Sequence, residues 1–275
     1  MFSSTMRSLV AVAGLAMATA SLAACAPSSS AHGLSVVATT TQICDYVTQI
    51  AARSADISLD KTDAAGKNSH VGAAPDGASL TMSLTCLLAP NASAHEHEMT
   101  PEQTSALAQA DVMAVSGVDL EHFLDDAVVS SGFKGRMVVT SGVLTAADVD
   151  NPGAPDPEGA YTIDRGSERV DVAPWPFPPE EAGEEPEFRF DPHVWTSPKG
   201  ARVQVANLGA GLAAAAPDAA SSINAATASY LEDIDALDEW TAEAIETVPE
   251  GQRVLFTSHD AFGYFSRDYG IRFIG

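Results

Sequence analysis

The chain has 275 residues, of which 45% are hydrophobic, so it is long enough for one large or two modest hydrophobic cores. Its 14 Lys and Arg residues against 37 Asp and Glu residues give a net charge of -23, which repels phosphate backbones and attracts cations. We therefore expect no nucleic acid partner. The sequence contains neither of the glycine-rich motifs GxGxxG and GxxxxGK[ST], so it gives no argument for a nucleotide site.

Residues 1–24 have the pattern of a lipoprotein signal peptide. One basic residue, Arg7, precedes an apolar run that is too short to span a bilayer. The small residues directly before Cys25 resemble the bacterial lipobox, after which the cysteine becomes the acylated first residue. Lipid chains on Cys25 would anchor the protein to the outer face of the cell membrane, an extracytoplasmic location. The alternative is an ordinary cleaved secretory signal in which Cys25 is incidental.

Strands and helices are predicted to alternate after a flexible tether at residues 25–35, which are rich in Ser, Ala and Pro. Short apolar runs indicate strands, and apolar residues three or four apart indicate helices. We expect strands at 34–38, 80–88, 112–115, 136–140 and 253–257, and helices at 42–53, 104–111, 120–129, 199–216 and 218–246. Strands separated by helices predict an α/β fold with parallel sheets covered on both faces.

Two polar stretches and one long helix set the expected domain organisation. Residues 59–79 predict a loop without regular structure. Residues 148–190 are rich in Asp, Glu and Pro and predict an acidic loop, either a solvated insertion or a low-affinity cation collector. The long helix would reach roughly 40 Å and either links two lobes or packs along one. We expect an N-terminal α/β lobe at 36–216, a linking helix at 217–247 and the start of a C-terminal lobe at 248–275.

The two remaining cysteines are Cys44, in the first turn of a predicted helix, and Cys86, near the end of the next predicted strand. Such positions can be neighbours in a βα unit, and an even pair outside the cytoplasm is compatible with a disulfide. The alternative is two buried free thiols. The spacing lacks the C-x-x-C pattern of a thiol-redox site.

Three histidines, His95, His193 and His259, each follow a strand-like or extended stretch. In open α/β sheets that is the end where ligands bind. Neutral imidazole is the commonest side-chain metal ligand. Three imidazoles suit Zn²⁺ and also Cu, Fe and Ni, whereas Mn²⁺ prefers more carboxylate. The sequence therefore predicts a metal site with Zn²⁺ as the expected ion and Mn²⁺ as the alternative.

The other histidines have a weaker case. His97 lies two residues from His95 and would face the opposite side of an extended segment, so it is the second candidate at this place. The remaining three lack the placement after a strand and are predicted to be surface residues. They are His32, His70 and His122.

Four segments carry a family resemblance. They are Val37-Ala38-Thr39-Thr40-Thr41-Gln42-Ile43, His95-x-His97-Glu98-x-Thr100-Pro101, Asp191-Pro192-His193-Val194-Trp195-Thr196-Ser197-Pro198 and Ser258-His259-Asp260-Ala261-Phe262-Gly263-Tyr264-Phe265. In order and spacing they resemble the cluster A-I metal-binding lipoproteins, the zinc- and manganese-binding receptors of bacterial ABC importers, across residues 34–275. The resemblance implies two lobes of parallel sheet with flanking helices, joined by one long rigid helix, with the metal site in the cleft.

The resemblance also implies which lobe carries each ligand. His95 and His193 would come from the first lobe and His259 from the second, and histidine at this third place resembles zinc receptors whereas glutamate resembles manganese receptors. Three features depart from the family. His97 stands where tyrosine is usual, the acidic loop lacks the histidines that zinc members often carry, and the family continues past residue 275 with a carboxylate ligand. We therefore expect the second lobe to be incomplete.

The function that the resemblance implies is capture of a divalent transition metal, zinc first, by a lipoprotein that hands it to a membrane permease. The alternatives are a manganese or iron receptor of the same family and a surface adhesin-type lipoprotein. A catalytic zinc site would need a general base beside the metal. No H-E-x-x-H sequence is present, and only Glu96 and Glu98 are near, so we expect no enzyme.

Overall fold

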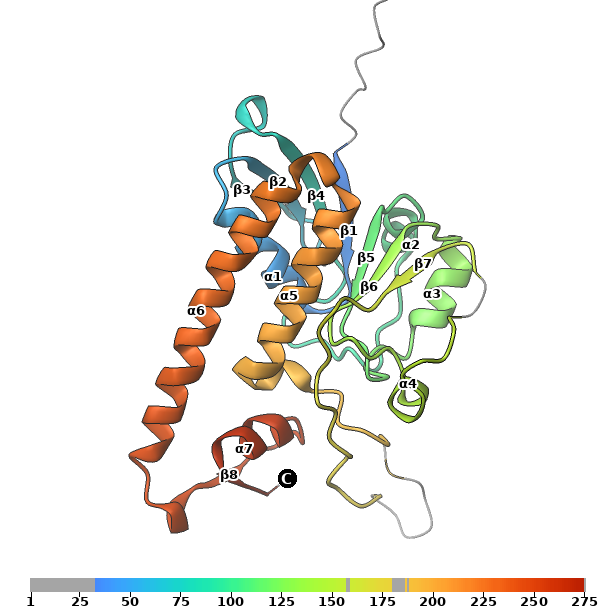
Figure 1. Ribbon diagram of the computed structural model, residues 1–275. Coiled ribbons are helices and arrows are strands. Elements are labelled where there is room, and N and C mark those ends of the chain that lie inside the picture. Colours follow the sequence, from blue (N-terminus) through green and yellow to red (C-terminus); the bar gives the residue numbers. More distant parts are fainter. Residues whose placement is uncertain (1–32, 157–158, 180–185, 187, 275) are drawn as a thin grey trace, which may run out of the picture. The chain divides into compact units, whose positions relative to one another are not determined.

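The computed structural model describes residues 33–156, 159–179, 186 and 188–274 (Figure 1). The predicted signal peptide, the predicted lipidation site Cys25, and His32 lie outside the described residues. Gly33–Gly275 form one compact unit. The division of this unit into two lobes and a linking helix therefore stays a prediction.

Seven strands form one sheet in the order β3-β2-β4-β1-β5-β6-β7. All neighbouring pairs are parallel except β2 and β3, which are antiparallel. The strands are β1 Leu34–Ala38, β2 Ile57–Thr62, β3 Asn68–Gly72, β4 Leu80–Cys86, β5 Val112–Val115, β6 Arg136–Val139 and β7 Thr162–Asp164. Ala38 at the end of β1 is in register with Cys86 of β4 and Ala114 of β5, so these three strands end side by side.

Helices cover both faces of this sheet, which explains why the central strands β1 and β5 are largely buried on both sides. Val36 of β1 faces a core shared with α1, α5 and α6, while its neighbour Val37 faces a second core shared with α2 and α3 (Figure 1). The helices are α1 Thr41–Ala52, α2 Pro101–Ala108, α3 Leu124–Ser131, α4 Ala146–Asp150, α5 Pro198–Ala215, α6 Ala220–Glu246 and α7 Gly263–Tyr269. The predicted α/β fold with a mostly parallel sheet and flanking helices is confirmed.

Helix α1 is defined by an N-cap residue and by a buried apolar face. Thr40 is extended and its side chain accepts a hydrogen bond from the Ile43 N–H at 3.2 Å, as an N-cap residue does. Ile43 and Ile50, seven residues apart, are both buried on the face toward the sheet. Cys44 in the first turn forms a disulfide with Cys86 at the end of β4, and the two Cα atoms are 5.6 Å apart. The alternative of two free thiols is therefore excluded.

The long helix α6 spans 27 residues and contacts α1, α5 and α7. Helix α6 approaches α5 so closely that a glycine is needed at position 209, because a Cβ there would lie only 2.3 Å from Thr227 Oγ1. Asp233 of α6 accepts a hydrogen bond from Arg53 of α1 at 2.6 Å, and Asp238 accepts one from Tyr269 of α7 at 2.6 Å. The helix thus contacts both the helical layer on the large sheet and the last helix of the chain.

A second, two-stranded parallel sheet consists of β8 Val254–Phe256 and β9 Arg272–Ile274, with α7 between them in the chain. Helix α7 is tied to the large-sheet region by Tyr264, which is almost fully buried. The Tyr264 hydroxyl donates to the Asp191 carbonyl at 2.8 Å and accepts from the Ala173 N–H at 3.2 Å. These bonds fix the start of α7 against the segment that precedes α5.

The prediction of an unstructured loop at residues 59–79 is wrong. The chain forms a hairpin of β2 and β3 whose turn contains Gly66 at φ 79°. Leu59 is fully buried and pairs with Met82 of β4, whereas the residues of β3 are mostly exposed at the edge of the sheet. Only one face of β2 carries apolar residues, so the polar composition of residues 59–79 gives no indication of a strand.

The predicted acidic loop also contains regular structure. Residues 148–150 form the end of α4, and β7 adds a further parallel strand next to β6. Phe188 is only 5% exposed, so the end of this stretch is not simply a solvated insertion. The reason is that a few isolated apolar residues among the acidic ones find partners in the rest of the fold.

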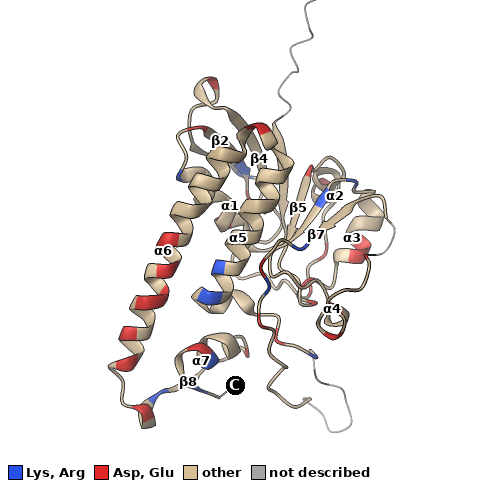
Figure 2. Cartoon of the chain, in the orientation of Figure 1, with Lys and Arg blue, Asp and Glu red and all other residues tan. Residues whose placement is uncertain are grey.

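Acidic residues dominate the charged surface. Figure 2 shows Asp and Glu along the C-terminal half of α6, and few Lys and Arg over the chain as a whole. Within the ranges that the structure describes, no helix combines the length and apolar character needed to cross a membrane.

Candidate metal centre

The candidate site lies at the carboxyl ends of three neighbouring strands. His95 follows β4, the start of α1 follows β1, and Leu120 follows β5. Because the strand order reverses around β1, the connections leave in opposite directions and open a crevice there, as is usual in open α/β sheets. A cavity of about 290 Å³ occupies this place, and its lining includes all three predicted histidines.

The three histidines come from separate segments and meet in this cavity. One nitrogen from each of His95, His193 and His259 lies within 4.8 Å of the others. The ring centroids of His95 and His193 are 5.5 Å apart, and those of His193 and His259 are 5.2 Å apart. Nitrogen ligands about 2.0–2.1 Å from a zinc ion lie about 3–4 Å from one another, so this spacing is close to that of a coordination sphere.

His193 is the most firmly oriented of the three. Its backbone N–H donates to Asp191 Oδ1 at 2.9 Å, and its ring Nδ1 lies 2.8 Å from the same oxygen. Both residues are 1% exposed. A proton on Nδ1 donated to the carboxylate leaves the lone pair on Nε2, the arrangement typical of metal-ligating histidines. Nε2 is buried and has no hydrogen-bond partner among the described residues.

His95 is kept neutral by its surroundings. Burial, and next the neighbouring His193, lower the pKa of His95 to about 4. Its Nδ1 is also buried without a hydrogen-bond partner in the described part of the chain. A buried imidazole nitrogen without a partner is costly unless a ligand uses its lone pair.

Aromatic side chains shield the histidines from one side. Phe188 lies 4.9 Å from the His95 ring, and Trp175 lies 5.9 Å from the His193 ring, measured between ring centroids. Both aromatics belong to the predicted acidic loop and were not identified from the sequence. The sequence feature that could have identified them is that they are large apolar residues in an otherwise polar stretch. Such apolar surroundings exclude water and strengthen polar interactions at a metal site.

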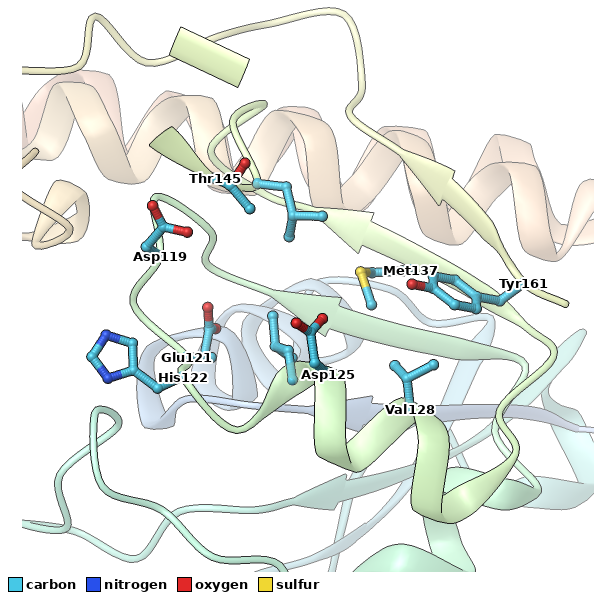
Figure 3. A pocket seen from close by; sticks show the side chains of 10 residues that line it. Asp119, Glu121, His122, Asp125, Val128, Met137, Thr145 and Tyr161 are labelled. Atoms are coloured by element: carbon cyan, nitrogen blue, oxygen red, sulfur yellow. The ribbon is translucent and has the colours of Figure 1, made fainter. Parts of the chain in front are cut away.

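The remaining described histidines do not join the group of three. His97 bonds to Gln103 Oε1 at 3.1 Å, so the second candidate for the first ligand is engaged elsewhere. His70 bonds to Asp60 at 3.0 Å on the edge of the sheet. His122 is exposed, with its ring centroid 6.1 Å from that of His95, and it borders a neighbouring pocket (Figure 3).

Glu121 is a buried residue of the site region that sequence reasoning missed. Its carboxylate accepts hydrogen bonds from the Thr39 hydroxyl at 2.6 Å and from the Ser116 and Gly117 N–H groups at 2.6 and 3.0 Å. These bonds join the end of β1 to the segment after β5 and hold that segment out of a helix. Helix α3 therefore begins at Leu124, later than the predicted residue 120. Burial raises the pKa of the Glu121 carboxyl.

Comparison with known families gives a match that covers most of the chain. Residues 78–275 match the family described as zinc-uptake complex component A, periplasmic. The matched region contains all three histidines of the candidate site.

Individual relatives bind different metals, according to their descriptions. The manganese-binding lipoprotein MntA of Bacillus subtilis (strain 168) is 28% identical over 228 residues, which are 83% of this chain and 63% of the relative. The iron-binding protein YfeA of Yersinia pestis is 27% identical over 183 residues, 66% of this chain and 48% of the relative. The chain thus spans less than two thirds of the length of either relative.

A solved structure supports the fold. The periplasmic zinc-binding protein TroA from Treponema pallidum aligns with a TM-score of 0.58 at 23% sequence identity, over 88% of this chain and 66% of that chain. At this level of identity the likeness shows the α/β architecture alone.

Proposed function

The chain belongs to the family of periplasmic zinc-uptake components A, and from this premise we propose that it captures a divalent transition metal, zinc first, for the membrane permease of an ABC importer. The family is one of solute-binding proteins and not of enzymes. A catalytic role for the three histidines is therefore set aside.

The observation that carries the proposal is that the imidazoles of three histidines meet at one place. Two of their ring nitrogens, His95 Nδ1 and His193 Nε2, are buried and have no hydrogen-bond partner among the described residues. Asp191 orients the His193 ring, and burial keeps His95 neutral, so His95 presents a lone pair near pH 7. His95 therefore does not have to lose a proton before a metal binds. No catalytic reaction is required, because a receptor only has to bind the metal ion and release it.

Zinc is the first choice because of the donor set. The group of three contains only imidazoles among the described residues, and neutral nitrogen ligands suit Zn²⁺ better than Mn²⁺. Manganese and iron form the second candidate, because MntA and YfeA are described as binding those metals.

Capture would connect two parts of the fold. His95 and His193 precede α2 and α5, which pack against the large sheet, whereas His259 lies between β8 and α7. His193 is buried and His259 is exposed. We propose that a metal held by all three residues ties the β8–α7 segment to the large sheet, and that release needs this tie to open.

The membrane anchor belongs to the same proposal. The lipobox-like sequence at Cys25 and the description of MntA as a lipoprotein support acylation and an extracytoplasmic location. The permease partner is supported by the description of the family as part of a zinc-uptake complex.

Calorimetric titration of the purified chain with Zn²⁺ and Mn²⁺ tests the proposal, with His95→Ala and His97→Ala as a matched pair. We expect one zinc ion per chain and weaker manganese binding. Removing a direct ligand should cost more than the about 10- to 100-fold typical of residues behind the ligands, so His95→Ala should lose at least about a hundredfold. His97→Ala should change the affinity little. Equal losses in both variants, or no stoichiometric binding, would contradict the proposal.

A further inference from the structure

Helix α7 contacts the segment that carries His193 on both sides of this residue. On the N-terminal side, the Tyr264 hydroxyl of α7 donates to the Asp191 carbonyl at 2.8 Å. On the C-terminal side, the Ser197 hydroxyl donates to Asp268 Oδ2 of α7 at 2.5 Å. Tyr264 and Ser197 are both buried, so water does not compete for these two bonds. The position of the His193 segment is therefore tied to that of α7.

Gly263, the first residue of α7, lies directly against the Asp191 side chain. A Cβ on Gly263 would be only 2.3 Å from Asp191 Oδ2 and 3.5 Å from Asp191 Cγ. Outside the local chain, these are the only heavy atoms of the described residues within 4 Å of such a Cβ. Any larger residue at this position would therefore push on the Asp191 carboxylate, and glycine permits the close approach.

The Asp191 carboxylate cannot move without losing its hydrogen bonds to His193. Its Oδ1 accepts from the His193 backbone N–H at 2.9 Å and lies 2.8 Å from Nδ1 of the same residue. Both side chains are buried, so water cannot easily replace these bonds. A displaced carboxylate would no longer hold the His193 ring in one orientation. The free space beside Gly263 is thus a condition for that orientation.

The same segment carries another of the three histidines. His259 lies four residues before Gly263, between β8 and α7, and is exposed. A shift of the start of α7 would therefore affect two of the proposed ligands. It would move His259 directly, and it would act on His193 through the Asp191 carboxylate.

Building on the metal-capture function proposed above, we propose that Gly263 is a positioning residue through which α7 sets the orientation of the His193 ring. Gly263 has no side chain that could touch the metal, and it acts only through Asp191. With α7 in place, the carboxylate is enclosed and holds the ring by Nδ1. When the start of α7 moves away, this enclosure opens as His259 leaves. The two histidines therefore bind and release the metal together.

Zinc affinity, measured by competition with a fluorescent chelator, tests this role with Gly263→Ala and Gly251→Ala as matched variants. Gly251 lies shortly before β8, and a Cβ there would have no neighbour within 4 Å among the described residues. We expect Gly263→Ala to bind zinc about 10- to 100-fold more weakly, the loss typical of residues behind metal ligands, and Gly251→Ala to bind it normally. Equal affinities of the two variants would overturn the proposal.

The Asp191→Ala background separates positioning from a general weakening of α7. Without the carboxylate, a Cβ at position 263 displaces nothing that orients His193. We therefore expect Gly263→Ala to cost no further zinc affinity in this background, whereas the effects of independent sites add. The same loss with and without the Asp191 carboxylate would show a merely structural effect of the added methyl group, and the proposal would be wrong.

Nuclear magnetic resonance of the metal-free chain with isotope-labelled histidine observes the His193 ring directly. A proton on Nδ1 that is bonded to a buried carboxylate exchanges slowly with water and gives a resolved signal, which Asp191→Ala identifies by its loss. We expect this signal in the unmodified chain and in Gly251→Ala, and its loss in Gly263→Ala. No such signal in the unmodified chain, or an unchanged signal in Gly263→Ala, overturns the proposal.

These outcomes separate the inference from the function on which it rests. The absence of zinc binding by the unmodified chain overturns the proposed function, whereas the resonance measurement needs no metal and still tests Gly263. If Gly263→Ala fails to fold, Tyr264→Phe takes its place, because it removes the hydroxyl between α7 and the Asp191 carbonyl and adds no atom. Exchange of the His193 Nδ1 proton should then be at least about fivefold faster, the change in an equilibrium that one lost hydrogen bond gives. An unchanged exchange rate overturns the proposal.

Discussion

Removing the disulfide between Cys44 and Cys86 should destabilise the protein strongly. The two cysteines are 42 residues apart, and closing a loop of that length in the unfolded chain corresponds to about 4 kcal/mol at 25 °C in the chain-entropy description. Both side chains are buried, at 5% and 3% exposed. We therefore expect the double variant Cys44→Ser/Cys86→Ser to lose about 4 kcal/mol of unfolding free energy.

Urea unfolding followed by circular dichroism measures this loss directly. For a domain of this size, about 2–4 °C of melting temperature accompanies each kcal/mol, so Tm should fall by about 8–16 °C. Dithiothreitol should lower the stability of the unmodified protein by a similar amount and leave the double variant unchanged. A double variant within about 1 kcal/mol of the unmodified protein would refute the reasoning, because even small closed loops are expected to contribute more.

Three further predictions concern residues around the site. Asp191→Asn should weaken zinc binding about 10- to 100-fold in a calorimetric titration, because the amide orients the His193 ring less well; an unchanged affinity would show that the carboxylate is not needed. Tyr264→Phe removes the hydroxyl between Asp191 and Ala173 and should cost about 1–3 kcal/mol in urea unfolding, a result contradicted by unchanged stability. Burial raises the pKa of Glu121 above its ordinary 4.5, so its contribution to stability is complete below that pH and is lost as the pH rises through the folded-state pKa. Unfolding free energies should therefore fall relative to Glu121→Gln above pH 4.5, and a difference independent of pH would contradict this assignment.

Much of the fold could be predicted because local signals and tertiary structure agree. The apolar spacing at 42–53 predicts α1, and the apolar runs at 112–115 and 136–140 predict β5 and β6. The β2–β3 hairpin could not be predicted, because β3 lies at an edge and exposes polar residues. β7 is only three residues long and is stabilised by pairing with β6, which the sequence does not reveal.

The candidate site could be predicted only in part. The three histidines stood out because each follows an extended stretch, and the structure brings their nitrogens within 4.8 Å; their role as metal ligands stays a proposal. Glu121 and Phe188 were missed because their contacts join segments far apart in the chain. The distance between Cys44 and Cys86 likewise depends on how α1 packs against β4, which no local pattern states.

Anomalous diffraction at the zinc absorption edge, from crystals of the chain grown with zinc, tests the central claim most directly. The account predicts one strong peak about 2.0–2.1 Å from a nitrogen of each of His95, His193 and His259. Crystals of the His193→Ala variant grown under the same conditions should lack this peak. A strong peak elsewhere on the chain, with the three imidazoles bound to nothing, would contradict the claim that these residues hold the metal.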